Sequence, residues 1–362
     1  MQQRTIADGR VSIAVSEICL GTMYFGYRTD EATAFAILDR FAEAGGTFLD
    51  TANCYGQWHG DAFESERVIG RWVRSRGMAG RMVIATKVGA RTTRPGDPDP
   101  RHWQGLGATA IRQDAEISLR NLGVDRLDLY YAHVDDRAAP LEETVGAMAA
   151  LAEAGQAGLL GCSNTATWRI ERARGIARAA GRPAYSCVQQ KYTYLQPQPD
   201  PGQLDLITEE LVDYAREENL SLLAYSPLLA GRYARPAEPL PGPYAHPGSH
   251  PRLTVLSEVA AELGATPGQV VLAWMLARSG PSIIPIPGAS TVKQLDEILA
   301  ATELTLDDDA IRRLDQAGRP APEAAALRAC RSLERELGPR SRRDVADLVP
   351  DSDPDRRWIA AP

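Results

Sequence analysis

Short runs of β-branched and aliphatic residues recur along the chain, separated by stretches in which apolar residues recur with helical spacing. Runs that are apolar throughout are typical of strands buried on both faces, as in parallel sheets. Stretches such as 31–45 and 141–155 end at glycine, as helices tend to. Eight strand–helix repeats without a long polar break predict an α/β fold, a single (β/α)8 TIM barrel. The predicted strands lie near residues 17–21, 47–50, 82–87, 127–132, 158–162, 186–190, 220–225 and 282–286.

The segments outside this rhythm are also informative. Residues 5–13 alternate around Asp8-Gly9, which predicts a β-hairpin that caps the bottom of the barrel. Between the seventh and eighth strands two helices are predicted, 252–264 and 266–280, the second with Thr266 as N-cap and Pro267 as its first residue.

Three long loops rich in proline and glycine follow strands, at residues 88–106, 193–203 and 231–250. Loops in this position extend over the C-terminal face of a barrel, and long ones usually form substrate walls. From about residue 319 the sequence becomes polar. We therefore predict a barrel domain at 1–318 and a polar C-terminal tail at 319–362, with room for one short helix.

Length and charge narrow the classes of function. A chain of 362 residues fits one large barrel with insertions, and 44% hydrophobic residues suffice for its core. The net charge of -7 argues against a nucleic-acid partner. No apolar run reaches the length of about 18 residues that predicts a membrane span. The N-terminus has no apolar signal core, which predicts a cytoplasmic protein.

Cysteine and histidine spacing does not predict a metal site. The five cysteines form no CxxC or zinc pattern, and the five histidines form no HExxH-like cluster. Cys54 has two interpretations, a small residue that fills space or a thiol whose oxidation would affect its neighbour Tyr55. The segment GLGATA (105–110) matches a dinucleotide fingerprint, but it follows a polar loop instead of a strand. We expect it to form the entry to the next helix.

Four polar residues stand at or just beyond the ends of predicted strands: Asp50, Tyr55, Lys87 and His133. The carboxyl ends of barrel strands converge on one face, where catalytic residues lie. An ammonium lowers the pKa of a nearby phenol, and a carboxylate holds an ammonium through a charge-assisted hydrogen bond. An imidazole beside them can donate to a carbonyl oxygen or share the proton. Taken singly, each has a structural alternative, such as a solvated charge, a core histidine or a turn aromatic.

The segments that contain these residues, DTANCYG, ATK and LDLYYAH, resemble those of the aldo-keto reductases. GCSN (161–164), VQQKYTYL (188–195), AYSPL (224–228) and residues 283–299 extend the resemblance to about residues 3–318. The resemblance implies reduction of a ketone or aldehyde, with the hydride from NAD(P)H and the proton from Tyr55. NADPH is the expected cofactor and NAD(H) is possible. Asp50, Tyr55, Lys87 and His133 would then form a catalytic tetrad, and Asp50 would also lie beside the cofactor.

The resemblance also implies cofactor contacts. Ser163, Asn164 and Gln189 would bind the nicotinamide carboxamide, and Tyr225 would stack on the ring. The family often has a basic residue near position 290 and an asparagine at 298, where this chain has Ser290 and Ile298. The remaining expected contacts are Gly21, Thr22 and Met23 beneath the nicotinamide, Ser226, Pro227 and Leu228 at the pyrophosphate, Gly288, Ser290, Gln294 and Glu297 at the adenosine end, and Arg232 at a phosphate.

Substrate contacts are sought among loop aromatics. Tyr24, Trp58, His59 and Trp103 are the predicted contacts together with His133, and Tyr27, Tyr194 and Tyr244 are further candidates. The mixture of aromatics with His59, Asp61, Arg101 and His102 favours a hydroxylated or sugar-like carbonyl over a steroid. Two alternatives belong to other classes. One is a cofactor-binding regulatory module of the same fold with little turnover, and the other is a barrel hydrolase. No metal cluster or carboxylate pair in the sequence supports the hydrolase, and the sequence leaves the oligomeric state open.

Overall fold

A computed structural model describes residues 1–97, 99–200, 202–278 and 280–318. The chain divides into two compact units, residues 1–315 and 316–362, and the fold described below belongs to the first. The predicted polar tail, 319–362, lies outside the described residues.

The N-terminal segment forms the predicted hairpin. Strands β1 (Gln3–Ala7) and β2 (Ser12–Ser16) are antiparallel, and the turn between them places Gly9 at a φ of 83°. The buried Ile6 and Val15 of the hairpin belong to the same apolar cluster as residues of the barrel strands. Ser16 N–H donates to Thr47 Oγ1 just before the second barrel strand, so the hairpin covers the end of the barrel where the strands begin. The predicted cap at the barrel bottom is thus confirmed.

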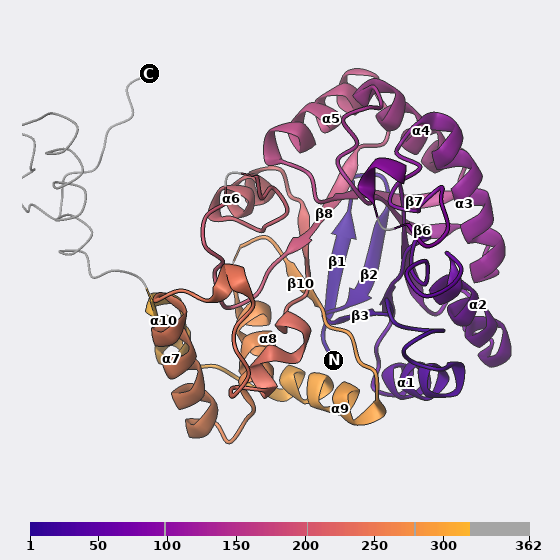
Figure 1. The fold of residues 1–362 in the computed structure, drawn as a ribbon. Coiled ribbons are helices and arrows are strands. Elements are labelled where there is room, and N and C mark those ends of the chain that lie inside the picture. Colours follow the sequence, from indigo (N-terminus) through magenta and orange to yellow (C-terminus); the bar gives the residue numbers. More distant parts are fainter. Residues whose placement is uncertain (98, 201, 279, 319–362) are drawn as a thin grey trace, which may run out of the picture. The chain divides into compact units, whose positions relative to one another are not determined.

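Eight parallel strands form the barrel, and the helices lie around it (Figure 1). Consecutive strands pair in chain order, and the last returns to the first through a bridge between Gly21 and Gly288. Each strand overlaps the segment predicted from the sequence. The strands are β3 (Cys19–Gly21), β4 (Phe48–Asp50), β5 (Val83–Val88), β6 (Leu127–Ala132), β7 (Ala157–Ser163), β8 (Tyr185–Lys191), β9 (Ser221–Tyr225) and β10 (Ile283–Ile286).

The helices predicted from the sequence are present, although some of their ends differ by up to three residues from the predicted ones. Thr266 caps α8 (Pro267–Ala277) in a reciprocal capping box with Gln269, and Pro267 is the first helical residue, as predicted. Gly107 is the N-cap of α3 (Ala108–Leu122), so GLGATA is indeed a helix entry. The other α-helices are α1 (Glu31–Glu43), α2 (Glu64–Arg76), α4 (Leu141–Glu153), α5 (Thr167–Ala179), α6 (Glu209–Glu217), α7 (Ser249–Glu262), α9 (Val292–Ala300) and α10 (Asp308–Gln316).

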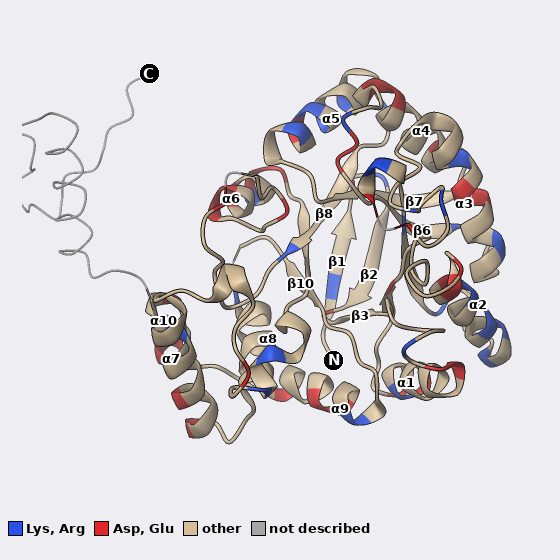
Figure 2. Ribbon diagram, viewed as in Figure 1, with Lys and Arg blue, Asp and Glu red and all other residues tan. Residues whose placement is uncertain are grey.

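The apolar core has two large parts, and a small third cluster of Ala52, Cys54 and Ala90 lies apart from them. One large part fills the barrel interior, where Phe48, Leu129 and Tyr131 are fully or almost fully buried, and the other lies between the strands and the outer helices. Charged residues of both signs lie mainly on the helices (Figure 2). Within the described residues no single helix is long and apolar enough to cross a bilayer. Taken together, α7 and α8 reach that length and composition, but only as a pair bent by 95°.

Candidate active site

The four predicted catalytic residues meet at the carboxyl ends of β4, β5 and β6. Lys87 Nζ donates to Asp50 Oδ2 at 2.6 Å, to the Thr51 carbonyl at 2.8 Å and to Tyr55 Oη at 3.0 Å. The Tyr55 and His133 rings make an edge contact with centroids 6.1 Å apart. Parallel neighbouring strands explain this arrangement, because Asp50 closes β4 beside β5, which carries Lys87.

Lys87 is charged in this environment. Its side chain is fully buried, which by itself lowers the pKa of an ammonium, but the Asp50 carboxylate and the hydrogen bonds to Asp50 and Tyr55 outweigh burial and raise the pKa of Lys87. Asp50 also accepts from Gln189 Nε2 at 2.7 Å through its second oxygen. The carboxylate is therefore held between a cation and an amide.

Tyr55 is protonated at neutral pH. Burial raises the pKa of its phenol above the usual value of 10, and the charge of Lys87 lowers it by less than burial raises it. The ammonium lowers the phenol pKa, as expected from the sequence, but burial raises it by more, so the net shift is upward. The sequence does not reveal this burial, and the expected lowering of the Tyr55 pKa is therefore not found. The phenol thus keeps a proton that it can donate.

His133 is neutral and held at two points. Burial, followed by the nearby Lys87 charge, depresses the pKa of its imidazole well below 6.5. Asn164 Nδ2 donates to the His133 carbonyl at 2.8 Å, and Cys54 Sγ lies 3.6 Å from His133 Nδ1. Burial raises the pKa of the Cys54 thiol to about 12, so the thiol is protonated and can donate to Nδ1. The tautomer that accepts this bond carries its proton on Nε2.

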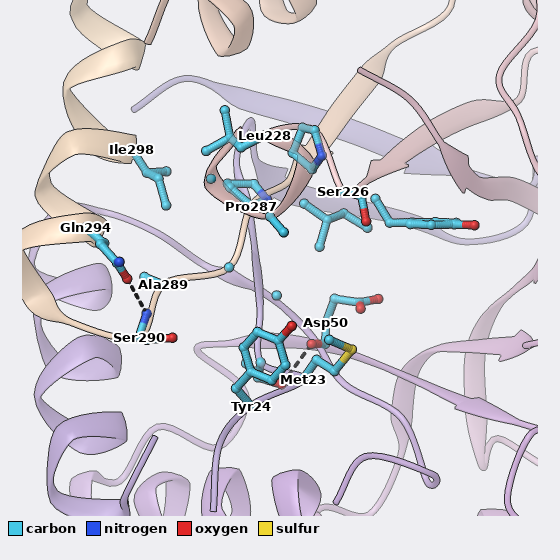
Figure 3. Close-up of a pocket in the computed structure, with 18 of the residues that line it drawn as sticks. Met23, Tyr24, Asp50, Ser226, Leu228, Pro287, Ala289, Ser290, Gln294 and Ile298 are labelled. Carbon is cyan, nitrogen blue, oxygen red and sulfur yellow. Dashed lines mark hydrogen bonds between the residues drawn. The ribbon is translucent and has the colours of Figure 1, made fainter. Parts of the chain in front are cut away.

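A cavity of about 1270 Å³ opens at this end of the barrel, and Tyr55 and His133 line it. Figure 3 shows part of its lining, including Met23 and Asp50. Lys87 lies behind Tyr55 with no exposed surface. Of the predicted substrate contacts, Tyr24, Trp58, Trp103 and His133 line the cavity. The predicted cofactor contacts that line it are Gly21, Thr22, Met23, Asp50, Ser163, Asn164, Gln189, Tyr225, Ser226, Pro227, Leu228, Gly288, Ser290, Gln294 and Glu297.

Several other candidates lie elsewhere. Arg232 is only 7% exposed, donates to Glu238 Oε2 at 2.5 Å and to the Pro239 carbonyl at 2.6 Å, and does not belong to the cavity lining. His59 is likewise absent from the lining, and its ring stacks on Tyr27 at 4.9 Å. Tyr194 and Tyr244 are buried in the core.

The polar loop residues also lie outside the lining. Arg101 pairs with Asp99, and His102 bonds to Asp97. Asp61 is exposed. The residues that suggested a hydroxylated substrate therefore do not line the cavity.

Sequence reasoning missed part of the lining. Arg28 and Arg235 also line the cavity, and so do residues 266–269 at the start of α8. The only sequence signal for residues 266–269 was the helix cap. Cys54 was noticed, but its contact with His133 could not be inferred, because those two residues are 79 positions apart.

The lining is chemically suited to a nicotinamide dinucleotide. Gln189 donates to Asp50, and Asn164 donates to the His133 carbonyl and to Ser163 Oγ, so these groups lie beside the four catalytic candidates. Figure 3 shows Ser290 and Gln294 on the opposite side of Tyr24 from Asp50. At the barrel seam the lining is backbone, because Gly21 pairs with Gly288 and a Cβ on Gly21 would meet Ile286 Cγ2 at 3.2 Å. An extended dinucleotide needs hydrogen-bonding groups at its two ends and, between them, backbone that it can approach closely.

Comparison with known proteins agrees with this geometry. The model of the Aldo/keto reductase family matches residues 17–319, and the chain belongs to this family. An uncharacterized oxidoreductase, YrpG, of Bacillus subtilis is 33% identical over 88% of this chain and 98% of its own length. Norsolorinic acid reductase stcV of Emericella nidulans is 32% identical over 84% of this chain and 78% of its own. Aldo-keto reductase yakc [NADP(+)] of Schizosaccharomyces pombe is 29% identical over 83% of this chain and 86% of its own length. Members of this family are oxidoreductases that act on small carbonyl compounds with nicotinamide cofactors.

Proposed function

We propose that this protein is an NAD(P)H-dependent carbonyl reductase in which Tyr55 donates the proton. The observation that carries the proposal is the hydrogen bond of 3.0 Å from Lys87 Nζ to Tyr55 Oη, at the wall of a cavity suited to the cofactor. A phenol held against a buried ammonium is stabilised as it becomes phenolate, which is the form that proton donation leaves behind. A fold alone would not support this function, since barrels host many reactions.

The residues divide the reaction between them. Reduced nicotinamide, when bound, supplies the hydride that adds to the carbonyl carbon. Tyr55 Oη gives its proton to the carbonyl oxygen, so that an alcohol forms, and Lys87 neutralises the developing phenolate. His133 Nε2–H orients the carbonyl oxygen toward Tyr55, while Asp50 holds Lys87. General acid catalysis of this type contributes about 10² to 10⁴ in rate.

The lining favours an aromatic ketone or aldehyde as substrate. Tyr24, Trp58 and Trp103 contribute rings, and Trp58 lies 6.4 Å from the Tyr55 ring, centroid to centroid. Aromatic rings pack well against such walls. One relative, from Pestalotiopsis microspora, is named aryl-alcohol dehydrogenase, and an aryl group is an aromatic ring. This substrate class replaces the hydroxylated or sugar-like carbonyl, whose supporting residues lie outside the lining.

NADPH remains the preferred cofactor in this proposal, with NADH as the alternative. One relative carries the label NADP(+). Apart from Arg28 and Arg235, the described lining residues include no lysine or arginine, and Arg232 is engaged by Glu238. The cytoplasmic location likewise remains a prediction.

Replacing Tyr55 with phenylalanine tests the proposal. The variant keeps the ring but loses the proton, so kcat should fall by about 10²-fold or more while KM changes little. NADPH affinity, measured by quenching of protein fluorescence, should stay within a factor of two or so, because the proposed cofactor contacts lie elsewhere. The substrate panel should contain aromatic ketones and aldehydes, keto-sugars and aliphatic carbonyls.

Two results would refute parts of this proposal. Normal turnover by Tyr55→Phe would end the mechanism, and turnover confined to keto-sugars would end the substrate class. The regulatory-module alternative expects cofactor binding with weak wild-type reductase activity and little further loss in the variant. Trp58→Phe is the matched control, since it changes a lining ring without removing an acid.

A further inference from the structure

Arg28 is one of the residues that line the cavity. It belongs to the loop between β3 and α1, is exposed, and lies over the rings of Tyr24 and Tyr27, with its Cζ 5.0 and 5.9 Å from their centroids. No carboxylate among the described residues forms an ion pair with Arg28. Stacking on two rings restricts the side chain and leaves the edge of its planar fork available to an anion.

The other cations at this site have partners. Lys87 is bound by Asp50, and Arg235, which also lines the cavity, pairs with Glu238. Arg232, expected at a phosphate, pairs with the same Glu238. Among the described lining residues, Arg28 is therefore the cation that has no acidic neighbour to neutralise it.

The position of Tyr24 indicates which anion Arg28 faces. Tyr24 follows Met23, at the end proposed for the nicotinamide. Figure 3 shows Tyr24 on the side of the opening opposite Ser226 and Leu228, with Asp50 on one flank and Ser290 and Gln294 on the other. Arg28 packs on this ring, so it lies midway along the cavity, between the regions proposed for the nicotinamide and for the adenosine. The group between those two ends of a dinucleotide is the pyrophosphate.

We propose that Arg28 binds the cofactor pyrophosphate from the wall opposite Ser226–Leu228. Those three residues offer a hydroxyl group and backbone but no positive charge, whereas a pyrophosphate carries two negative charges. A guanidinium satisfies phosphate oxygens with paired N–H donors. Arg28 thus supplies the cation that Arg232 was expected to supply. This inference rests on the proposed function, because it requires a nicotinamide dinucleotide in the cavity.

Cofactor titration of the full chain tests the inference. Arg28→Gln should raise the dissociation constants of NADH and NADPH by the same factor, about tenfold to a hundredfold, which corresponds to the loss of a charge-assisted hydrogen bond. Arg28→Lys, which keeps the charge but not the fork, should fall between wild type and Arg28→Gln. Arg120→Gln is the matched control, since this exposed arginine of α3 does not line the cavity, and its dissociation constants should equal those of wild type. Unchanged Tm values would show that all variants are folded.

The possible outcomes are separable. Unchanged affinity for both cofactors in Arg28→Gln would overturn the assignment. It would also be overturned if only NADPH were weakened, because Arg28 would then face the 2′-phosphate, or if only the KM of carboxylate-bearing substrates rose. Failure of the wild type to bind either cofactor would instead refute the proposed function.

Discussion

The Asp50 carboxylate accepts a 2.6 Å hydrogen bond from Lys87 Nζ, although the two residues are 37 positions apart in the chain. Both side chains are almost completely buried, at 4% and 0% exposure. A buried ion pair of this kind tolerates the loss of neither partner, because the remaining charge is left without compensation. Because Lys87 bonds both Asp50 and Tyr55, loss of the pair should change both the stability of the protein and the proton donation by Tyr55.

We predict that Lys87→Met abolishes measurable turnover and also lowers stability. The buried Asp50 carboxylate would lose its cation, at a cost of about 3–5 kcal/mol in the free energy of unfolding. Asp50→Asn should destabilise less, because the amide oxygen of the new side chain would still accept from Lys87, yet kcat should also fall. Denaturant unfolding measures the first effect and single-turnover kinetics the second. Full activity in either variant would contradict the proposed role of the pair.

A second prediction concerns the contact of 3.6 Å between Cys54 Sγ and His133 Nδ1. If the thiol selects the imidazole tautomer with its proton on Nε2, Cys54→Ala should reduce kcat/KM by roughly threefold to tenfold, the size of a modest hydrogen bond. Cys54→Ser keeps a donor and should retain more activity. A role in packing alone predicts equal losses in both variants, so the comparison of alanine with serine decides between the two.

The fold was accessible from the sequence because parallel strands are buried on both faces. Each apolar run between amphipathic helices matched a strand, and capping signals such as Thr266-Pro267 placed helix ends correctly. The grouping of the four tetrad residues could be predicted as well. Residues at strand ends, such as Asp50 and Lys87, converge on one face of a barrel regardless of the loop conformations.

The loops could not be predicted in the same way. Arg232 looked like a phosphate ligand, but it pairs with Glu238 six residues later, a contact that composition does not reveal. Tyr194 looked like a pocket residue, yet it is buried beneath Arg252 and α8. No role was predicted for Arg28, because its stacking on Tyr24 depends on side-chain geometry that the sequence does not reveal. Side-chain partners in irregular segments depend on tertiary contacts, which leave no periodic signal.

A third prediction addresses the cofactor. We expect NADPH to bind more tightly than NADH, because one relative carries the label NADP(+). A single charge-assisted contact to the 2′-phosphate would contribute about 1.5–3 kcal/mol, or roughly tenfold to a hundredfold in affinity. Lys293, in the first turn of α9, is the nearest basic residue in sequence to Ser290 and Gln294. Lys293→Gln should reduce the preference if this side chain makes the contact. Equal or tighter binding of NADH by the wild type would refute the preference.

A fourth prediction concerns the C-terminal segment. A chain ending at Gly318 should fold with a Tm within a few degrees of the full-length protein, because α10 already supplies Leu314 to the apolar cluster between the strands and the outer helices. Tyr194 Oη also donates to the Leu314 carbonyl. KM for the carbonyl substrate should rise if residues 319–362 border the site. Failure of the shortened chain to fold would place the domain boundary further along the chain.

The last prediction is a pH dependence of stability that originates at Glu66. This glutamate of α2 is fully buried and accepts from Thr86 Oγ1 at 2.5 Å, and burial raises the pKa of its carboxyl from 4.5 to about 7. Asp114 is the nearby charge that adds to this shift, whereas hydrogen bonds from Thr86 and Asn121 oppose it.

The sign follows from proton binding. Between pH 4.5 and 7 the folded state holds a proton on Glu66 that the unfolded state has released, so stability falls as pH rises through this window and levels off above it. The contribution amounts to at most about 3 kcal/mol. Glu66→Gln keeps the shape of the side chain but cannot ionise, so its stability should decline less between pH 5 and pH 7.5 or so. Urea unfolding at several pH values measures this difference. Glu116→Gln, on the exposed surface of α3, should follow the wild-type curve, and parallel curves for wild type and Glu66→Gln would show that Glu66 does not titrate in this range.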